Sequence, residues 1–212
     1  MRTVIQIFLG IAIIILGFLV WESIMTPIRF NKEKAIRERA VIRKLIDIRE
    51  AQKAYKDLNI KYTDNFDTLI NFVKNDSFTL VRAIGLIPEE LIDETKDIRK
   101  ARQIALERGI IRRETTKISV LDSLFGKNYP IDSIRYVPYT DKYEFNMKTD
   151  EYTSSSTLII RVIEVSVPYE VFLDGLDPQL VINYAEERNI ITSFPGLKFG
   201  SLTEGSLTGN WE

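Results

Sequence analysis

Residues 4–20 read VIQIFLGIAIIILGFLV, a stretch that carries no charge and a single amide, Gln6. Extended by Trp21, Ile24 and Met25, it offers roughly 20 residues, which at about 1.5 Å rise per residue cover a hydrocarbon core of about 30 Å. A cleaved signal peptide has a shorter apolar part, of about 7 to 15 residues. The sequence therefore predicts a retained transmembrane anchor, made by Val4, Ile5, Phe8, Leu9, Ile11, Ile13, Ile14, Ile15, Leu16, Phe18, Leu19 and Trp21.

A charged amphipathic helix is predicted after the anchor. Pro27 lacks a backbone N–H, so we expect it to kink the helical rod or to divide it into two helices. Apolar residues then recur every three or four positions up to Leu58, at Val41, Leu45, Ile48, Ala51 and Tyr55. This face is expected to pack on the protein's own sheet, because it lacks the strict heptads of a coiled coil.

The predicted organisation has three parts: a transmembrane anchor at 1–27, an amphipathic stalk helix at 28–58 and an α+β soluble domain at 59–212. The polar face of the stalk is assigned to Arg39, Arg43, Lys44, Arg49, Glu50 and Lys53.

The elements of the soluble domain are inferred from local patterns. Short helices are expected through residues 69–73, near 88–94 and at 95–108, with a strand at 77–84 and a helix or connector at 118–125. Further on, β-branched and aromatic residues predict an antiparallel meander, with strands at 133–138, 143–147, 157–167 and 169–173. Asp177-Pro178 marks the start of a helix, and residues 195–212 are expected to be rich in loops.

The composition excludes several kinds of chemistry. With 29 basic and 30 acidic side chains the net charge is −1, so no overall positive field attracts nucleic acid. The chain has no cysteine and no histidine, which removes thiol nucleophiles, imidazole bases and their metal sites. No phosphate-binding loop is present either. We therefore expect a protein that is not an enzyme and that binds neither nucleic acid nor a small-molecule substrate.

Several segments resemble type IV pilins and the pseudopilins of type II secretion. The helix end AQKAYK (51–56) is followed by NIKYT (59–63) and FDTLI (66–70), and the last four residues are Gly-Asn-Trp-Glu. Pro27 lies about where the pilin helix has its proline. Ile60 and Thr63 stand where the family has glycine and proline, and Gly10 stands where its helix has a glutamate. The resemblance implies a long helix packed on an antiparallel sheet.

The function expected from this resemblance is a structural subunit or scaffold of a secretion or pilus-like envelope apparatus. Its partners would be the membrane and other protein subunits of that complex, and its place the inner membrane, as a single-pass protein with a periplasmic domain. A bitopic assembly protein of such machines and a membrane-tethered solute-binding domain or enzyme remain as alternatives. Positive charges after the anchor, at Arg29, Lys32 and Lys34, favour a cytoplasmic domain. Large domains can cross against this bias, so orientation stays open.

Aromatic side chains give the candidate interaction residues, because tyrosine and tryptophan supply rigid contact area at interfaces. These candidates are Tyr136, Tyr139, Tyr143 and Trp211. No cofactor is expected. Calcium is the one cation that the oxygen-rich turns would suit, with candidate ligands Asp141, Glu144, Asp150 and Glu151 in one group and Glu204, Asn210 and Glu212 in the other. The basic run Arg99-Lys100-Ala101-Arg102, together with Arg112-Arg113, is interpreted as a solvated helical face.

Overall fold

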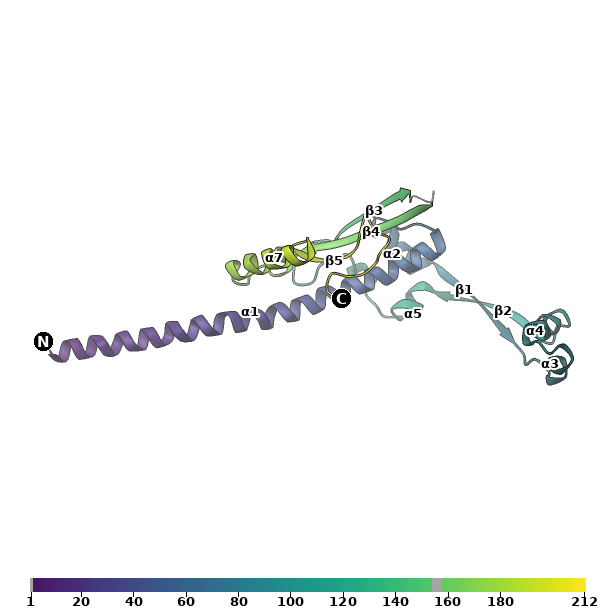
Figure 1. The fold of residues 1–212 in the computed structure, drawn as a ribbon, viewed down its shortest axis with the longest axis horizontal. Helices are drawn as coiled ribbons and strands as arrows, with labels where there is room; N and C mark the ends of the chain where they lie inside the picture. Colours follow the sequence, from purple (N-terminus) through teal and green to yellow (C-terminus); the bar gives the residue numbers. More distant parts are fainter. Residues whose placement is uncertain (1, 154–157) are drawn as a thin grey trace. The chain divides into compact units, whose positions relative to one another are not determined.

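The computed structural model describes residues 2–153 and 158–212 and has the expected α+β class (Figure 1). Its residues group into two compact units. Unit 1 contains Met1–Phe66 and Asp132–Glu212, and unit 2 contains Asp67–Ile131. The predicted soluble domain at 59–212 thus falls into both units, a division that its residue patterns did not predict.

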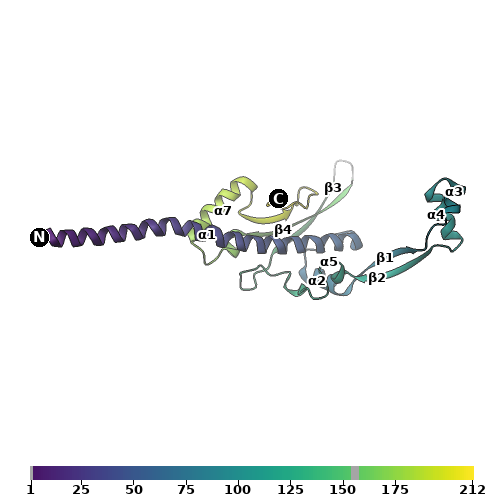
Figure 2. The same cartoon turned by 90° about the horizontal axis from the view of Figure 1, so that it is seen from below.

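The first helix, α1 (Arg2–Asn59), runs without interruption from the apolar stretch into unit 1 (Figures 1 and 2). Pro27 lies inside it, so the predicted alternative of two separate helices is wrong. Polar side chains connect the turns on either side of the proline: Thr26 donates to Glu22 at 3.4 Å, and Arg29 pairs with Glu22 at 3.4 Å. Local contacts of this kind help a helix to continue past the backbone donor that proline lacks.

The second half of α1 forms the core of unit 1. Val41, Leu45, Ile48 and Ala51 are fully buried, as their spacing predicts, and Tyr55 is nearly so. The helix contacts β5, and the amide of Gln52 reaches Met147 in β3, so this face packs on the unit's own sheet. Leu58, assigned to the same face, is instead half exposed, because the helix ends one residue later.

The sheet of unit 1 has three antiparallel strands, β3 (Asn146–Thr153), β4 (Ile159–Pro168) and β5 (Gly196–Gly200), in that order. The register sets Asn146 opposite Ser166 and Pro168 opposite Gly196. Two helices, α6 (Tyr169–Phe172) and α7 (Pro178–Thr192), connect β4 to β5. Helix α7 begins as Asp177-Pro178 predicts, since the Asp177 side chain accepts from the Leu180 N–H at 3.1 Å.

Several predicted strands of the meander are corrected. In place of the predicted strand 169–173, residues 169–172 form α6, because Pro168 ends the ladder and Tyr169 and Phe172 are both buried on one face of a helical turn. The segment 133–138 has only the end of the 3₁₀ turn η1 (Ile131–Ser133) and an isolated bridge between Tyr136 and Glu144. Strand β3 begins inside the predicted strand 143–147 and continues through Asp150 to Thr153. Residues 154–157, which include the start of the predicted strand 157–167, lie outside the described residues.

Strand β5 lies in the segment expected to be loop. Its end residues are glycines for a physical reason: a Cβ atom on Gly196 would collide with the Val167 carbonyl, and one on Gly200 with the Ile163 carbonyl. The close approach of these backbones is visible only once the strands pair.

Unit 2 contains a long two-stranded ribbon. Strands β1 (Ser77–Ile84) and β2 (Arg112–Ser119) pair antiparallel from Ser77 opposite Ser119 to Ile84 opposite Arg112. Helix α2 (Phe66–Asn75) leads into the ribbon and α5 (Val120–Leu124) follows it. Strand β1 was predicted. Strand β2 was not, because its sequence, RRETTKIS, has few apolar residues and gains its strand conformation by pairing with β1.

Two short helices, α3 (Glu89–Thr95) and α4 (Ile98–Glu107), connect the ribbon strands. They pack on each other around Leu91, Ala101, Ala105 and Ile111. Asp97 separates them by capping α4, its side chain accepting from the Arg99 N–H at 2.8 Å. Gly109 follows α4 with a φ of 70°, in the role of helix stop that its position predicts.

The end of α1 contains a strained residue. Ile60 follows the helix with a φ of 62°, a left-handed conformation that favours glycine, and it donates its N–H to the Lys56 carbonyl at 2.7 Å. It is also 70% exposed, so its side chain gains little from packing. The backbone here thus has the conformation of a glycine cap although the residue is β-branched.

We expect Ile60→Gly to stabilise unit 1 by about 0.5–1 kcal/mol, because the left-handed penalty of a bulky residue exceeds the added entropy of glycine in the unfolded chain. Urea unfolding, followed by Trp211 fluorescence in a Trp21→Phe chain, measures the change. Lys61→Gly is the matched control at the next, exposed position, which lacks a positive φ, and it should destabilise. A loss of stability in Ile60→Gly would contradict the interpretation.

Candidate functional site

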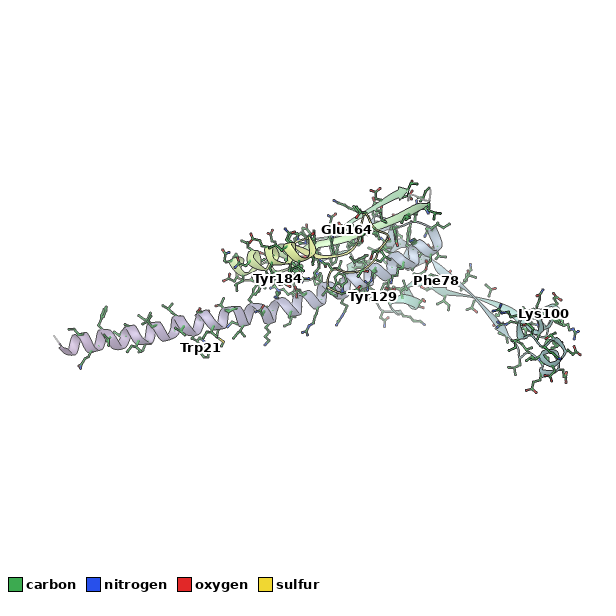
Figure 3. All side chains as sticks on the ribbon, in the orientation of Figure 1. Trp21, Phe78, Lys100, Tyr129, Glu164 and Tyr184 are labelled. Carbon is green, nitrogen blue, oxygen red and sulfur yellow. The ribbon has the colours of Figure 1, made fainter. Side chains whose placement is uncertain are left out.

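The predicted anchor residues lie on the outer surface of α1. From Ile5 to Trp21 the large apolar side chains are between 52% and 76% exposed, and Figure 3 shows them extending from the helix with no other element around them. The helix is long and apolar enough to cross a membrane, which is consistent with a single transmembrane span. Val4 belongs to the same helix, but its side chain is outside the described part.

The turns of α1 that follow Pro27 are joined to α7 by aromatic and charged side chains. The Tyr184 hydroxyl donates to Glu38 at 2.8 Å, and the Lys34 ammonium lies 3.7 Å from the centre of the Tyr184 ring (Figure 3). Tyr169 meets the same ring edge-on, with 4.8 Å between centroids. Burial, followed by the hydrogen bond to Glu38, raises the pKa of Tyr184, so the phenol keeps its proton and remains a donor.

Arg37 connects α1 to the segment after α6. Its guanidinium donates to the carbonyls of Phe172 at 3.0 Å and Asp174 at 2.7 Å, and it stacks 5.4 Å from the centre of the Tyr139 ring. At about 1.5 Å rise per residue, Arg37 lies about 15 Å along the helix from Pro27. One side chain thus holds two surface loops beside the helix.

Residues 135–145 form a short hairpin loop that presents two of the candidate tyrosines. Val137 donates to the Tyr143 carbonyl at 2.8 Å, and Phe145 donates to the Arg135 carbonyl at 3.1 Å. Tyr139 has a φ of 65° at the tip. Tyr139 and Tyr143 are 54% and 45% exposed, which leaves about half of each side chain available for contact.

This loop and α6 enclose an open cleft of about 650 Å³, lined by Tyr139, Thr140, Asp141, Tyr143, Glu170, Val171 and Asp174. Two phenol rings and three carboxylates form its polar surface. Because aromatic faces and carboxylates both attract cations, the cleft is suited to a positively charged side chain or a small organic cation.

The other two candidate residues lie elsewhere. Tyr136 is half-buried at the base of the hairpin, in its bridge to Glu144. Trp211 is half-buried near the carboxyl end and packs over Gly209, whose hydrogen leaves room for the indole ring. The structure therefore brings Tyr139 and Tyr143 to one cleft and leaves Tyr136 and Trp211 outside it.

Arg49 fixes the carboxyl-terminal residues to α1. It pairs with Glu212 at 2.6 Å and donates to the Leu207 carbonyl at 3.2 Å. The hydrogen bond that Arg49 donates to the Glu212 carboxylate holds the pKa of Glu212 below its ordinary value of 4.5. Arg49 was predicted to lie on the free polar face of the stalk. The structure instead shows it half-buried in this contact.

The candidate calcium ligands make other contacts. Glu144 pairs with Arg135 at 3.3 Å and Glu151 with Arg161 at 2.8 Å, while Asp150 accepts from the Glu151 N–H at 2.8 Å. In the second group, Asn210 bonds to the Gly196 carbonyl at 2.9 Å and Glu212 to Arg49. Among residues 2–153 and 158–212, no cluster of three or more carboxylates has the geometry to hold a metal ion.

Three polar residues of α1 make contacts that were not predicted from the sequence. Gln52 is fully buried and donates to the Thr63 carbonyl at 2.7 Å, which ties the loop after the helix to its last turns. Lys44, placed on the polar face by its charge, is half-buried and donates to Ser133 Oγ at 3.0 Å; burial lowers its pKa. Arg37, Lys44 and Gln52 are seven and eight positions apart, about two helical turns, so they lie along one side of α1, a signal present in the sequence.

No protein-family model, no curated protein and no solved structure significantly matches this chain.

The contact between Arg49 and Glu212 predicts an acid-sensitive carboxyl end. A carboxyl whose folded pKa is lowered contributes stability above its ordinary pKa of 4.5, and this contribution is lost as the pH falls through the folded value. In a Trp21→Phe chain we expect Trp211 fluorescence to change below pH 4.5 as the end is released. Arg49→Gln should remove this transition, and an unchanged transition in that variant would assign it to another group.

Proposed function

We propose that this chain is a single-pass membrane protein that works as a structural subunit or scaffold of an envelope assembly, and that it is not an enzyme. The observation that carries the proposal is the continuity of α1. The helix has a fully exposed apolar surface from Ile5 to Trp21 and a buried face from Val41 to Tyr55. A helix that is apolar all round is stable in lipid, whereas unit 1 needs water around its charged surface.

The mechanism would be positional. Because the anchor and the core of unit 1 are parts of one helix, the folded unit is held at a fixed distance from the lipid. The cleft of Tyr139 and Tyr143 would then lie near the membrane surface, at the height of Arg37 along α1. We propose that protein subunits of the same complex bind there, since exposed tyrosines supply large contact area at low entropic cost.

A pilin-like or pseudopilin-like assembly is the kind we favour. The packing of α1 on a three-stranded antiparallel sheet supports this view, as does the left-handed backbone at Ile60, where that family has glycine. An inner-membrane location with a periplasmic unit 1 belongs to the same proposal.

Membrane insertion is tested by alkaline carbonate extraction of membranes from cells that express the full chain. We expect the chain to stay in the membrane fraction and Ile14→Arg to weaken its retention, because a charge near the middle of a span costs about 2.5–3.5 kcal/mol on insertion scales. Ile190→Arg is the control, since Ile190 is 85% exposed on α7. Full extraction of the unaltered chain would overturn the anchor.

Orientation is tested with reporters joined after Glu212. Alkaline phosphatase, which is active only in the periplasm, should be active in the fusion, and a cytoplasmic fluorescent reporter should be dark. The reverse result would remove the periplasmic scaffold and the assembly-protein alternative together.

A tethered solute-binding domain is a second candidate, favoured by the cleft of about 650 Å³ and its carboxylates. If this were the function, small diamines would raise the melting temperature of the full chain, and Glu170→Gln would abolish the shift. Glu186→Gln, an exposed carboxylate on α7 outside the cleft, is the control. The scaffold proposal expects no shift in any of these chains.

A further inference from the structure

Unit 2 ends in a small helical module, here called the head and defined as residues 85–111, between the two strands of the ribbon. The exposed charges of its two helices are mostly of opposite sign, while Lys96, Glu107 and Arg108 at the helix ends depart from this separation. Helix α3 carries only acidic charges and α4 mostly basic ones. The acidic set is Glu89, Glu90, Asp93 and Glu94, and the basic set is Arg99, Lys100 and Arg102, all of them exposed (Lys100 is labelled in Figure 3).

Close ion pairs within the head do not account for this arrangement. In the described part of the chain, none of these seven side chains takes part in a salt bridge. Arg99 and Lys100 lie in the first turn of α4, where the helix dipole disfavours positive charge. Arg99 and Lys100 are therefore placed against the dipole of their own helix, next to the capping carboxylate of Asp97.

Apolar side chains are exposed where the head joins the ribbon. Leu86 is 89% exposed, Ile84 50% and Ile110 42%. The backbones of Gly85 and Ile110 lie close together, since a Cβ atom on Gly85 would lie 2.6 Å from the Ile110 carbonyl oxygen. The three exposed side chains are therefore carried by neighbouring stretches of backbone. The ribbon itself consists of two strands, and isolated two-stranded ribbons are only marginally stable in water.

We propose that the head is a docking module for the head of a second copy of this chain, with α3 of each copy lying against α4 of the other. A two-fold contact of this kind sets the acidic helix beside the basic helix twice and buries Leu86 between the copies. A lipid surface or a nucleic acid presents mainly negative charge and would leave the acidic helix repelled. A second copy presents both signs in complementary places.

The size of the module fits a weak contact. A standard interface buries about 800 Å² on each partner, which is a large demand on a module of this length. Association of the heads thus depends on a high local concentration of copies.

The absence of cysteine from the chain allows a clean cross-linking test. Leu86→Cys in the full chain is treated in cells with bismaleimidoethane, a short, membrane-permeant reagent that joins two thiols. Ile190→Cys on α7 is the matched control, because its position is 85% exposed. We expect several-fold more covalent dimer from Leu86→Cys. Equal yields from the two variants would overturn the proposal.

Charge reversal, made in the Leu86→Cys chain, tests the pairing of the helices. R99E/K100E/R102E gives a head with two acidic helices, and E89K/E90K/D93K/E94K gives one with two basic helices. Each variant alone should lose the dimer through repulsion, and co-expression of the two, with different tags, should restore it as a mixed dimer. Retained dimer in either variant alone would refute the proposal. The proposal would also be refuted if E89K/E90K/D93K/E94K bound anionic vesicles but formed no mixed dimer with the acidic variant. That result would indicate that the head binds lipid.

Discussion

The burial of one face of α1 against the β3-β4-β5 sheet is the interaction on which the rest of unit 1 depends. Val41, Leu45 and Ile48 are fully buried there, and each such side chain contributes about 1.5–3 kcal/mol relative to an exposed one. The same helix then fixes the surface loops through its polar residues, with Arg37 at the tyrosine hairpin, Arg49 at the carboxyl end and Gln52 at the loop after the helix. Loss of this packing would release all three segments at once.

The continuity of the helix gives this packing its functional meaning. The exposed apolar turns before Pro27 and the buried turns after Val41 belong to one hydrogen-bonded element, so under the proposed function an anchor in lipid constrains the folded unit as well. The contacts of Lys34 and Glu38 with Tyr184 extend the support of unit 1 towards Pro27. A scaffold needs this kind of fixed height, whereas a tethered binding domain works equally well on a flexible linker.

The two units supply different kinds of surface for partners. The cleft of unit 1 is aromatic and acidic and lies against a well-packed helix, which favours a partner that contributes a cationic side chain. The head of unit 2 presents opposite charges on two neighbouring helices and an apolar junction around Leu86. Under the two proposals, the cleft would bind a different subunit and the head a second copy of the chain.

The sequence alone determined the features that depend on local patterns. The length of the apolar stretch, the buried face of α1, the start of α7 at Asp177-Pro178 and the stop at Gly109 follow from hydrophobic periodicity and from backbone preferences of single residues. Strand β2, the helical turn α6 and strand β5 were decided by tertiary structure, because pairing with β1, burial of Tyr169 and Phe172, and close approach to β4 override weak local preferences. The meeting of Tyr139 and Tyr143 with Glu170 likewise depends on Arg37, which joins segments more than 100 residues apart in the chain.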